Sequence, residues 1–280
     1  MTCQQKQQIY NLLKTAADSV LGFRVKSFDT TPVFYDDPLP APQNLQEQTD
    51  LHEPSLAAPL EAPPAASSDH SSLDFSTVHS SLEDSICNLK NQISACSRCA
   101  LAKTRNNTVP GTGSLKPVVL VVGEGPGFEE DRQGLPFVGP AGQLLDKMLA
   151  AISLSRISNT YIANIVKCRP PQNRDPYPEE AEACSSFLQA QIALLKPKAI
   201  LCVGSVAAKN LLKTEAGVSR LRGNFYQYHN IPVAVTYHPS ALLRSQDLKR
   251  PAWEDLKQFR LKLLELCPDY ESSCQPYVSH

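Results

Sequence analysis

Hydrophobic residues are spread unevenly along the chain, and their spacing predicts alternating helices and strands from about residue 82 onward. Four short runs are almost continuously apolar, which is typical of strands buried on both faces of a sheet. Between these runs, apolar residues recur every three or four positions, as on one face of a helix. The expected strands are Val118–Val122, Tyr161–Val166, Ala199–Val203 and Ile231–Thr236, and the expected helices begin near Leu82 and cover Ala141–Ile152, Pro178–Leu195, Ser205–Leu212 and Pro251–Leu266.

Buried strands joined by helices predict an α/β fold with a single central parallel sheet flanked by helices. In such folds, ligands bind at the carboxyl ends of the strands. The Gly-rich loop after Val122, the region of Asn164 and the turn at His238 all fall at predicted strand ends. We therefore expect these three segments to meet in one site.

The chain before residue 82 has a different character. Residues 1–25 are expected to form a short amphipathic helix, and residues 26–81 are rich in Pro, Ser, Ala and acidic residues. Such a composition cannot bury enough apolar surface to form a core, so we expect a disordered linker. The helix before it is then a candidate recognition element for a protein partner. The predicted domain covers residues 82–267, followed by a tail at residues 268–280.

The net charge of −1 hides an opposite balance in two parts of the chain. Up to residue 85, four Lys and Arg residues stand against twelve Asp and Glu residues, whereas the remainder has twenty-three against sixteen. A basic body suits a phosphate backbone, because neutralising phosphates releases counterions. Many solvated surfaces carry a similar excess, so charge alone does not decide for nucleic acid. Without an export signal or a long apolar run, we expect a cytoplasmic protein with no membrane partner.

The nine cysteines indicate metal or redox chemistry rather than disulfides, because no signal peptide is recognisable. Cys96 and Cys99 form a C-x-x-C after a predicted helix, Cys168 follows a strand, and Cys184 lies on a later helix. Zinc and a [4Fe–4S] cluster both accept four thiolates, and the spacing does not choose between them. A redox pair or incidental cysteines are the alternative.

The loop Gly123-Glu124-Gly125-Pro126-Gly127 invites comparison with a dinucleotide-binding loop but fits it poorly. Pro126 breaks the pattern, no helix is expected to start directly, and the acidic residues at 129–131 would repel a pyrophosphate. We interpret it instead as a loop whose backbone closely approaches a flat, neutral ligand. Phe137 is a candidate for stacking on that ligand, with an ordinary core aromatic as the alternative.

Three long segments, taken together, resemble the family 4 uracil-DNA glycosylases, the iron–sulfur branch of that superfamily. They are GEGPGFEEDRQGLPFVGPAGQLLDKML from Gly123, NIVKCRPPQNRDPYPEEAEAC from Asn164 and HPSALLR from His238, and the resemblance covers roughly residues 90–265. It implies a hydrolase, a DNA N-glycosylase that releases uracil from uracil-containing DNA and so starts base-excision repair. It also implies a uracil-DNA glycosylase-like three-layer sandwich, and a structural [4Fe–4S] cluster on Cys96, Cys99, Cys168 and Cys184. We expect a monomer.

The resemblance also gives each pocket residue a role that its chemistry can perform on a base flipped out of the helix. Phe137 would stack on uracil, Asn164 would bind O4 and N3–H, and His238 would donate to O2 as the base leaves with negative charge. The backbone of Gly123, Glu124 and Gly125 would contact the base edge and the attacking water. Glu130, or less readily Glu129, would crowd the C5 edge and exclude a thymine methyl group.

The water-activating group is left open by the resemblance. Better-studied members of the superfamily carry an aspartate where this chain has Gly125. Glu124 would then orient the water, or a weakly activated water would capture an oxocarbenium-like state.

For contact with DNA, the segment Ser240–Arg244 is expected to enter the minor groove, with Leu242 as the wedge and Arg244 on a phosphate. Further phosphate contacts are expected from Arg169, Arg174, Arg220 and Arg222, each of which would serve equally as a solvated surface charge.

Two other interpretations remain at this point. A related branch traps uracil-DNA covalently through a histidine in a basic insertion, but no such insertion lies between Phe137 and Asn164. A non-catalytic iron–sulfur DNA-binding or adaptor protein would use its acidic arm to recruit partners and keep the pocket as a relic.

Overall fold

The computed structural model describes residues 81–275. The expected helices are present in these residues, with small shifts of their ends, and three shorter ones, α3, α7 and α8, join them. The helices are α2 (Leu82–Ser94), α3 (Phe128–Gln133), α4 (Pro140–Ala150), α5 (Pro178–Leu195), α6 (Ser205–Leu212), α7 (Val218–Leu221), α8 (Pro239–Arg244) and α9 (Lys249–Leu266), with 3₁₀ turns at Ala100–Lys103, Pro171–Asn173, Gln246–Leu248 and Tyr270–Ser273. The expected N-terminal helix and linker lie outside the described residues.

The sheet has six strands in the order β1-β3-β2-β4-β6-β5. The four expected strands form its centre and pair in parallel, which confirms the predicted fold class. They are β2 (Val119–Gly123), β3 (Thr160–Asn164), β4 (Ala199–Val203) and β6 (Ile231–Thr236), and nearly every residue in them is buried. Burial on both faces is what a continuous apolar run predicts for a parallel strand.

Two short edge strands, β1 (Thr112–Gly113) and β5 (Phe225–Tyr228), pair antiparallel with β3 and β6 and were not expected from the sequence. The sheet is therefore mixed at its edges. In β5 exposed and half-buried residues alternate, so it lacks the apolar run that marked the inner strands. The hairpin to β6 turns at His229 and Asn230, both with positive φ, which is the conformation that a tight two-residue hairpin requires.

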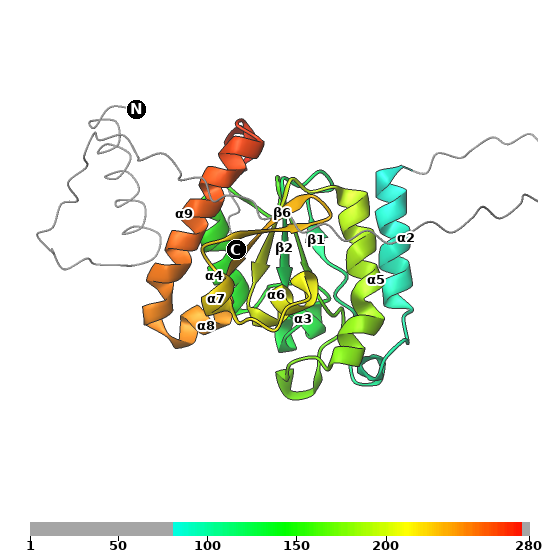
Figure 1. Cartoon of the computed structure of the whole chain (residues 1–280). Helices are drawn as coiled ribbons and strands as arrows, with labels where there is room; N and C mark the ends of the chain where they lie inside the picture. Colours follow the sequence, from blue (N-terminus) through cyan, green and yellow to red (C-terminus); the bar gives the residue numbers. More distant parts are fainter. Residues whose placement is uncertain (1–80, 276–280) are drawn as a thin grey trace, which may run out of the picture. The chain divides into compact units, whose positions relative to one another are not determined.

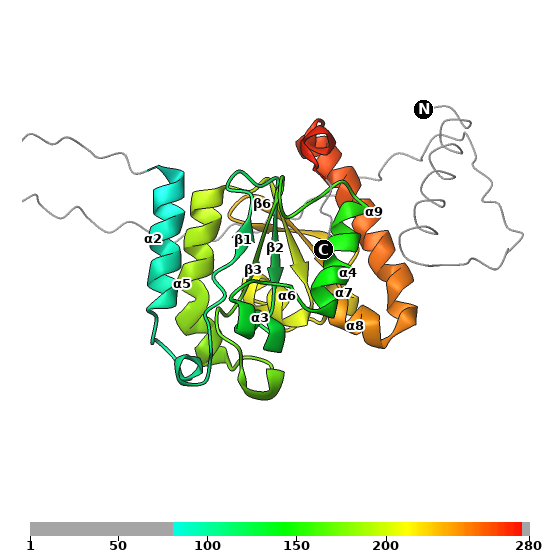
Figure 2. The same cartoon turned by 180° about the vertical axis from the view of Figure 1, so that it is seen from behind.

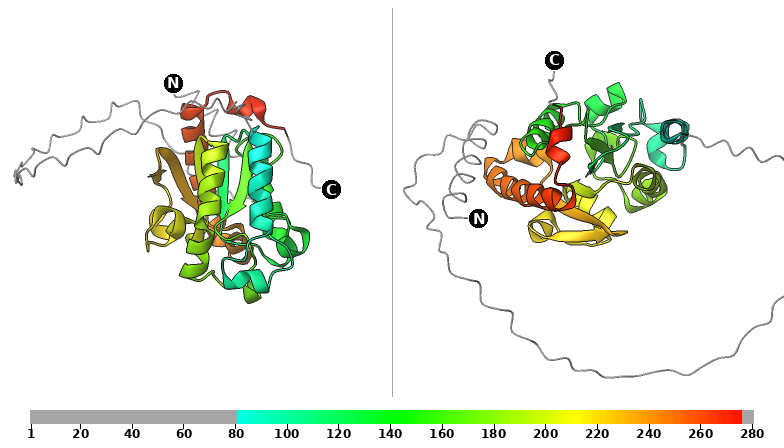
Figure 3. Two further views of the ribbon diagram at one scale, coloured as in Figure 1. Left: turned by 90° about the vertical axis from the view of Figure 1, so that its right-hand side faces the viewer. Right: turned by 90° about the horizontal axis from the view of Figure 1, so that it is seen from above.

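Helices cover both faces of the sheet, giving three layers (Figures 1 and 2). Apolar residues of α2, α5, α6 and α7 pack on one face, and those of α4, α8 and α9 pack on the other. Figure 3 shows the same layers from the side and from above. Helix α2 begins with a capping box, in which Asp84 N–H donates to Ser81 Oγ and Ser81 N–H donates to the Asp84 carboxylate.

The described part of the predicted tail packs on this body. Tyr270 is 1% exposed, and its hydroxyl donates to Ile152 O at 2.8 Å. The folded region thus extends beyond residue 267, since a large buried side chain is held there by the end of α4.

The chain order of the strands positions the site. After β2 the chain passes to β3 on one side, and later to β4 on the other side of β2. In open α/β sheets, a crevice forms outside the carboxyl ends of the strands where the order reverses. The Gly123 loop follows β2 at that place.

Candidate active site

A cavity of about 700 Å³ opens at the carboxyl ends of β2, β3, β4 and β6. Residues from all three segments singled out in the sequence line it, so the convergence expected from the strand ends is present. The predicted residues in the lining are Glu124, Gly125, Glu130, Phe137, Asn164, Arg174, His238, Ser240 and Arg244.

Gly123 lies behind this lining and allows two of its side chains to meet. It pairs with Asn164 in the β2–β3 register. An added Cβ at Gly123 would lie 2.6 Å from the Phe137 ring and would also overlap Asn164 Oδ1. Any larger residue would therefore push the ring and the amide apart, so the glycine is needed for close approach.

Asn164 lines the cavity and carries a buried polar atom without a partner. The residue is 1% exposed, and its Oδ1 has no hydrogen-bond partner among the described residues. Its backbone is held, because Lys167 Nζ donates to Asn164 O at 2.8 Å and to Gln191 Oε1 at 2.7 Å. A buried acceptor without a partner is costly in the folded state unless a ligand satisfies it.

Phe137 is buried, and its ring faces His238 with centroids 5.6 Å apart at an angle of 33°. The backbone of Phe137 has φ of 53°, a left-handed conformation that bulky residues rarely adopt. The flat wall that it forms is thus set by an unusual backbone and not by packing of the ring alone.

His238 is the N-cap of α8, and its ring is oriented by the first turn of that helix. Ser240 N–H donates to His238 Nδ1 at 3.2 Å, and the Ser240 hydroxyl lies 2.8 Å from the same nitrogen. Because Nδ1 accepts the backbone N–H, the proton of the neutral ring is on Nε2. Burial, helped by the charge of Arg244, lowers the pKa of His238 to about 4, against a smaller opposing effect of Glu130. At neutral pH the ring is an uncharged donor.

Glu124 follows β2 and lines the cavity. Burial, together with the nearby charge of Asp175, raises the pKa of Glu124 to about 7. Next to it, an added Cβ at Gly125 would lie 2.8 Å from Val166 Cγ2. A side chain at position 125 would need Val166 to move.

The acidic run after the loop begins helix α3 at Phe128, which corrects the expectation that no helix starts there. Glu130 Oε1 accepts hydrogen bonds from Val138 N–H at 2.9 Å and Gly139 N–H at 3.0 Å. Its carboxylate therefore borders the cavity and holds the two backbone N–H groups just before α4. Glu129 is instead exposed and paired with Arg132 at 2.8 Å.

The predicted DNA-contact segment forms helix α8, and one assignment in it needs correction. Leu242 is 3% exposed and packs in the core, so it is not available as a wedge. Leu243 is 47% exposed and takes its place as the candidate. Arg244 lines the cavity, whereas Ser240 is tied to His238.

The arginines expected on phosphates differ in their freedom. Arg174 binds both oxygens of Glu180 at 2.8 Å, and Arg222 is paired with the buried Asp255 at 2.8 Å. Asp255 also accepts the Thr236 hydroxyl, so Arg222 helps to anchor the end of β6, two residues before His238. Arg169 lies over the Phe128 ring at 5.2 Å, and Arg220 is exposed.

The four predicted cysteine ligands converge. Cys96, Cys99, Cys168 and Cys184 line one small pocket between α2, α5 and the loop after β3. Burial is the main cause that raises the pKa of Cys168 and of Cys184. Arg105 donates to Cys168 Sγ at 3.1 Å. Within residues 81–275, no three His, Cys, Asp or Glu side chains are grouped so that they could hold a single metal ion.

Several residues that build the site were not predicted, among them Lys167, Arg156 and Asp255. Each is a charged residue that is almost fully buried. The sequence does not show which charged residues are buried, because Lys, Arg and Asp are mostly exposed in proteins. Only the fold shows that they pin the backbone behind the lining residues.

A family model described as the uracil DNA glycosylase superfamily matches residues 110–257, more than half of the chain. The chain belongs to this superfamily. The relative from Archaeoglobus fulgidus, named type-4 uracil-DNA glycosylase, is 42% identical over 203 residues, which cover 70% of this chain and 100% of the relative. A type-4 relative from Pyrobaculum aerophilum is 42% identical over 175 residues, covering 60% of this chain and 89% of its own length.

The chain also resembles the type-5 branch of the superfamily, but the matching region covers less of this chain. A type-5 uracil-DNA glycosylase from Pyrobaculum aerophilum is 33% identical over 150 residues, covering 48% of this chain and 66% of the relative. The type-4 relatives match more closely and over more of the chain, so it belongs to the type-4 family. Among the described helices of this family member, none is long and apolar enough to cross a membrane.

Proposed function

We propose that this type-4 family member is a uracil-DNA glycosylase that hydrolyses the N-glycosidic bond of a deoxyuridine flipped out of DNA and so starts base-excision repair. The observation that carries the proposal is the meeting of Phe137, Asn164 and His238 around one cavity. A flat ring, an amide with an unpartnered oxygen and a neutral imidazole match the face, the N3–H/O4 edge and the O2 atom of uracil.

Recognition of uracil follows from this arrangement. Asn164 Oδ1, buried without a partner, accepts the N3–H of uracil, while the amide nitrogen donates to O4. Cytosine offers a bare N3 and an amino group at the same edge, so two repulsive contacts replace two hydrogen bonds as long as the amide keeps this orientation. A rotated amide would accept cytosine, so discrimination requires neighbouring groups that fix it. Glu130 occupies the side of the cavity next to the Phe137 turn, where a carboxylate disfavours the methyl group of thymine.

His238 stabilises the leaving group. As the bond between C1′ and N1 of uracil breaks, its electron pair goes to the base, and negative charge develops on O2. The proton on His238 Nε2 forms a hydrogen bond to that oxygen and stays on the ring, because the ring is neutral at pH 7. A donor fixed in advance in a cavity shielded from water is worth more than the same donor in water.

Glu124 positions the water that adds to C1′. Its carboxylate accepts one proton of the water, whose oxygen forms the new bond to the sugar. With a pKa of about 7, Glu124 is a stronger base than an exposed carboxylate and can take that proton near neutral pH. No aspartate is needed at position 125 for this step.

The four converging cysteines are proposed to hold a [4Fe–4S] cluster. The set consists of thiols, which are the ligands of such clusters. The four thiols line one small pocket, and the resemblance to the iron–sulfur branch of the glycosylases favours a cluster there, in which each thiolate binds its own iron, over zinc. The cluster would fasten α2 and α5 to the loop after β3, which follows Asn164. Its role here is structural.

The remaining parts of the proposal concern partners and location. We propose that the enzyme acts as a monomer, in the cytoplasm, on uracil-containing DNA, and that residues 1–81 recruit a protein partner. Non-catalytic DNA binding is not favoured, because Phe137, Asn164 and His238 line one cavity, and covalent trapping is not favoured, because no basic insertion with a histidine lies between Phe137 and Asn164.

The first prediction concerns the activity itself. Wild-type protein incubated with a uracil-containing oligonucleotide gives alkali-labile abasic sites, and His238→Ala lowers the single-turnover rate by about 10²-fold or more. Strand cleavage after alkali treatment measures both. No cleavage at enzyme excess would sink the proposal, and an adduct that survives denaturing gels would favour the covalent alternative.

The second prediction concerns Glu124. The single-turnover rate of the wild type rises with pH up to about 7 and then levels off, since the carboxylate form predominates above its pKa. Glu124→Gln is slower, and its rate is flat over this range, in which His238 does not titrate. Asp175→Asn moves the wild-type midpoint to lower pH, because the Asp175 charge raises the pKa of Glu124. An unchanged profile in Glu124→Gln would contradict the role.

The third prediction compares two adjacent leucines. Leu243→Ala slows excision from duplex DNA by about tenfold and leaves the melting temperature unchanged, because the exposed side chain acts as the wedge. Leu242→Ala instead lowers the free energy of unfolding by about 2–5 kcal/mol, as for a buried leucine. Equal excision rates for Leu243→Ala and wild type would refute the wedge.

The fourth prediction concerns the cluster. Protein purified without oxygen is brown, absorbs broadly near about 400 nm and contains iron. Cys168→Ser loses the colour and much of the thermal stability, whereas Cys87→Ser, a change at an exposed cysteine, retains both. A colourless wild-type preparation that carries zinc would show the assignment to be wrong.

A further inference from the structure

The backbone at Phe137 is held in a conformation that needs an external cause. Its φ of 53° lies in the left-handed region, which is an outlier for a bulky aromatic residue. Such a backbone is energetically costly and persists only where surrounding contacts fix it. The contacts around Phe137 are therefore informative about what the protein uses this turn for.

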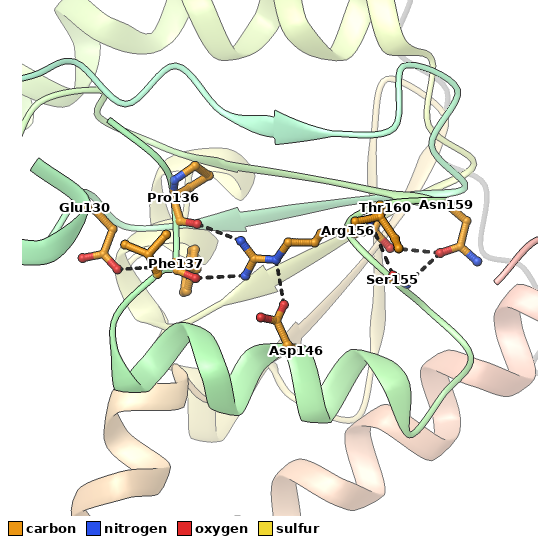
Figure 4. A network of polar contacts seen from close by, with 10 residues as sticks. Glu130, Pro136, Phe137, Asp146, Ser155, Arg156, Asn159 and Thr160 are labelled. Atoms are coloured by element: carbon orange, nitrogen blue, oxygen red, sulfur yellow. Dashed lines mark hydrogen bonds and ion pairs between the residues drawn. The ribbon is translucent and has the colours of Figure 1, made fainter. Parts of the chain in front are cut away.

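Arg156 makes the first set of these contacts. Its guanidinium donates to Pro136 O at 3.0 Å and to Phe137 O at 2.9 Å, so it grips the carbonyls on both sides of the Phe137 Cα. The third nitrogen, Nε, is paired with Asp146 of α4 at 2.8 Å. Figure 4 shows the planar fork directed at the turn from the inside of the domain. Arg156 is 8% exposed, so these bonds are shielded from water.

Two further contacts pin the same turn. Glu130 accepts the next two backbone N–H groups, those of Val138 and Gly139, as Figure 4 shows in part. On the helix side, Gly142 lies so close to Phe137 O that an added Cβ would overlap it. Carbonyls held by Arg156 and N–H groups held by Glu130 leave the peptides around Phe137 little freedom to rotate.

The backbone around Arg156 is held by hydrogen bonds and belongs to the same segment of the chain as Asn164. Ser155 N–H donates to Asn159 Oδ1 at 2.8 Å, and Thr160 N–H donates to Ser155 O at 3.1 Å. Strand β3 starts at Thr160 and ends at Asn164. One continuous segment therefore presents the Asn164 amide at its far end and reaches the Phe137 turn with Arg156.

We propose that Arg156 is a positioning residue for base recognition: its fork on the Pro136 and Phe137 carbonyls presets the Phe137 ring at the stacking distance from the base that Asn164 binds. The inference rests on the proposed glycosylase function. Asp146 orients the fork through Nε. Lysine cannot replace Arg156, since one ammonium group cannot bind two carbonyls and a carboxylate in a planar arrangement.

A merely structural arginine would stabilise the domain without affecting the base, so the test uses readouts that separate the two roles. Arg156→Lys keeps a positive charge beside Asp146 and removes the fork. We expect it to slow single-turnover release of uracil by at least tenfold and to weaken inhibition by free uracil by a similar factor. Binding to a duplex with an abasic-site analogue, which has no base to stack, changes less than twofold.

A double-mutant cycle with Phe137→Ala gives the decisive comparison, because interacting residues show non-additive effects. Once the ring is gone, Arg156→Lys is expected to add less than a threefold further loss. If it slows Phe137→Ala as much as it slows the wild type, the proposal is overturned. A wild-type rate in Arg156→Lys, with only a lower melting temperature, overturns it as well.

Two further variants complete the test: one weakens the same contact more mildly, and the other is a matched control. Asp146→Asn leaves the fork in place but weakens its orientation, and we expect a smaller loss that also disappears in the Phe137→Ala background. It serves if Arg156→Lys is unfolded at the assay temperature. Arg260→Lys is the matched control, since Arg260 pairs with Glu271 at 2.8 Å away from the cavity, and its rate stays within twofold of wild type. Uracil release by the wild type in the same series separates failure of the proposed function from failure of this inference.

Discussion

The close approach of the Phe137 ring and of the Asn164 amide to the bare backbone of Gly123 is the constraint on which the rest of the site depends. It exists because β2 and β3 run in parallel and end side by side, so Gly123 and Asn164 are register partners. The turn at Phe137 then brings a flat ring to the same place. In the proposed function, the ring is the stacking surface and the amide the hydrogen-bonding edge for one planar ligand, and both are in position before any ligand arrives. Preorganisation of this kind removes the cost of ordering the site during binding.

The electrostatic character of the cavity follows from its burial. The same desolvation that lowers the pKa of His238 raises that of Glu124, because both shifts disfavour the charged form. A neutral histidine and a carboxylate that titrates near neutral pH result from one environment. In the proposed mechanism, the histidine donates a hydrogen bond without giving up its proton, and the carboxylate accepts a proton. The division of labour between leaving group and water thus needs no further charged residue in the lining.

Behind the lining, buried charged residues connect the site to the scaffold. Lys167, which directly precedes Cys168, ties the Asn164 backbone to α5 through Gln191. Asp255 of α9 holds the end of β6 below His238 through Thr236. Arg156 holds the Phe137 turn. Each of the three recognition residues therefore has its own buried polar anchor on a different element, which makes the cavity a property of the whole domain.

The sequence predicted the parts of this arrangement that depend on local pattern. The four inner strands were predictable because burial on both faces demands continuous apolar runs, and His238, Asn164 and the glycine loop because they stand at the ends of those runs. Edge strands β1 and β5 escaped prediction, since β1 has only two residues and β5 is half exposed. Which of Leu242 and Leu243 faces solvent is decided by the rotation of α8 against the core, and the long reach of Arg156 to Phe137 by tertiary packing. Neither is encoded in spacing.

The central claim is that Gly123, Phe137, Asn164 and His238 form one preset pocket for uracil. A crystal structure of the protein with free uracil tests it most directly. The account predicts that the base lies flat on the Phe137 ring, with Asn164 at N3–H and O4, His238 Nε2 at O2, and the Phe137 backbone still in its left-handed conformation. Uracil bound elsewhere, or a pocket in which the Phe137 turn has rearranged to admit the base, would contradict it.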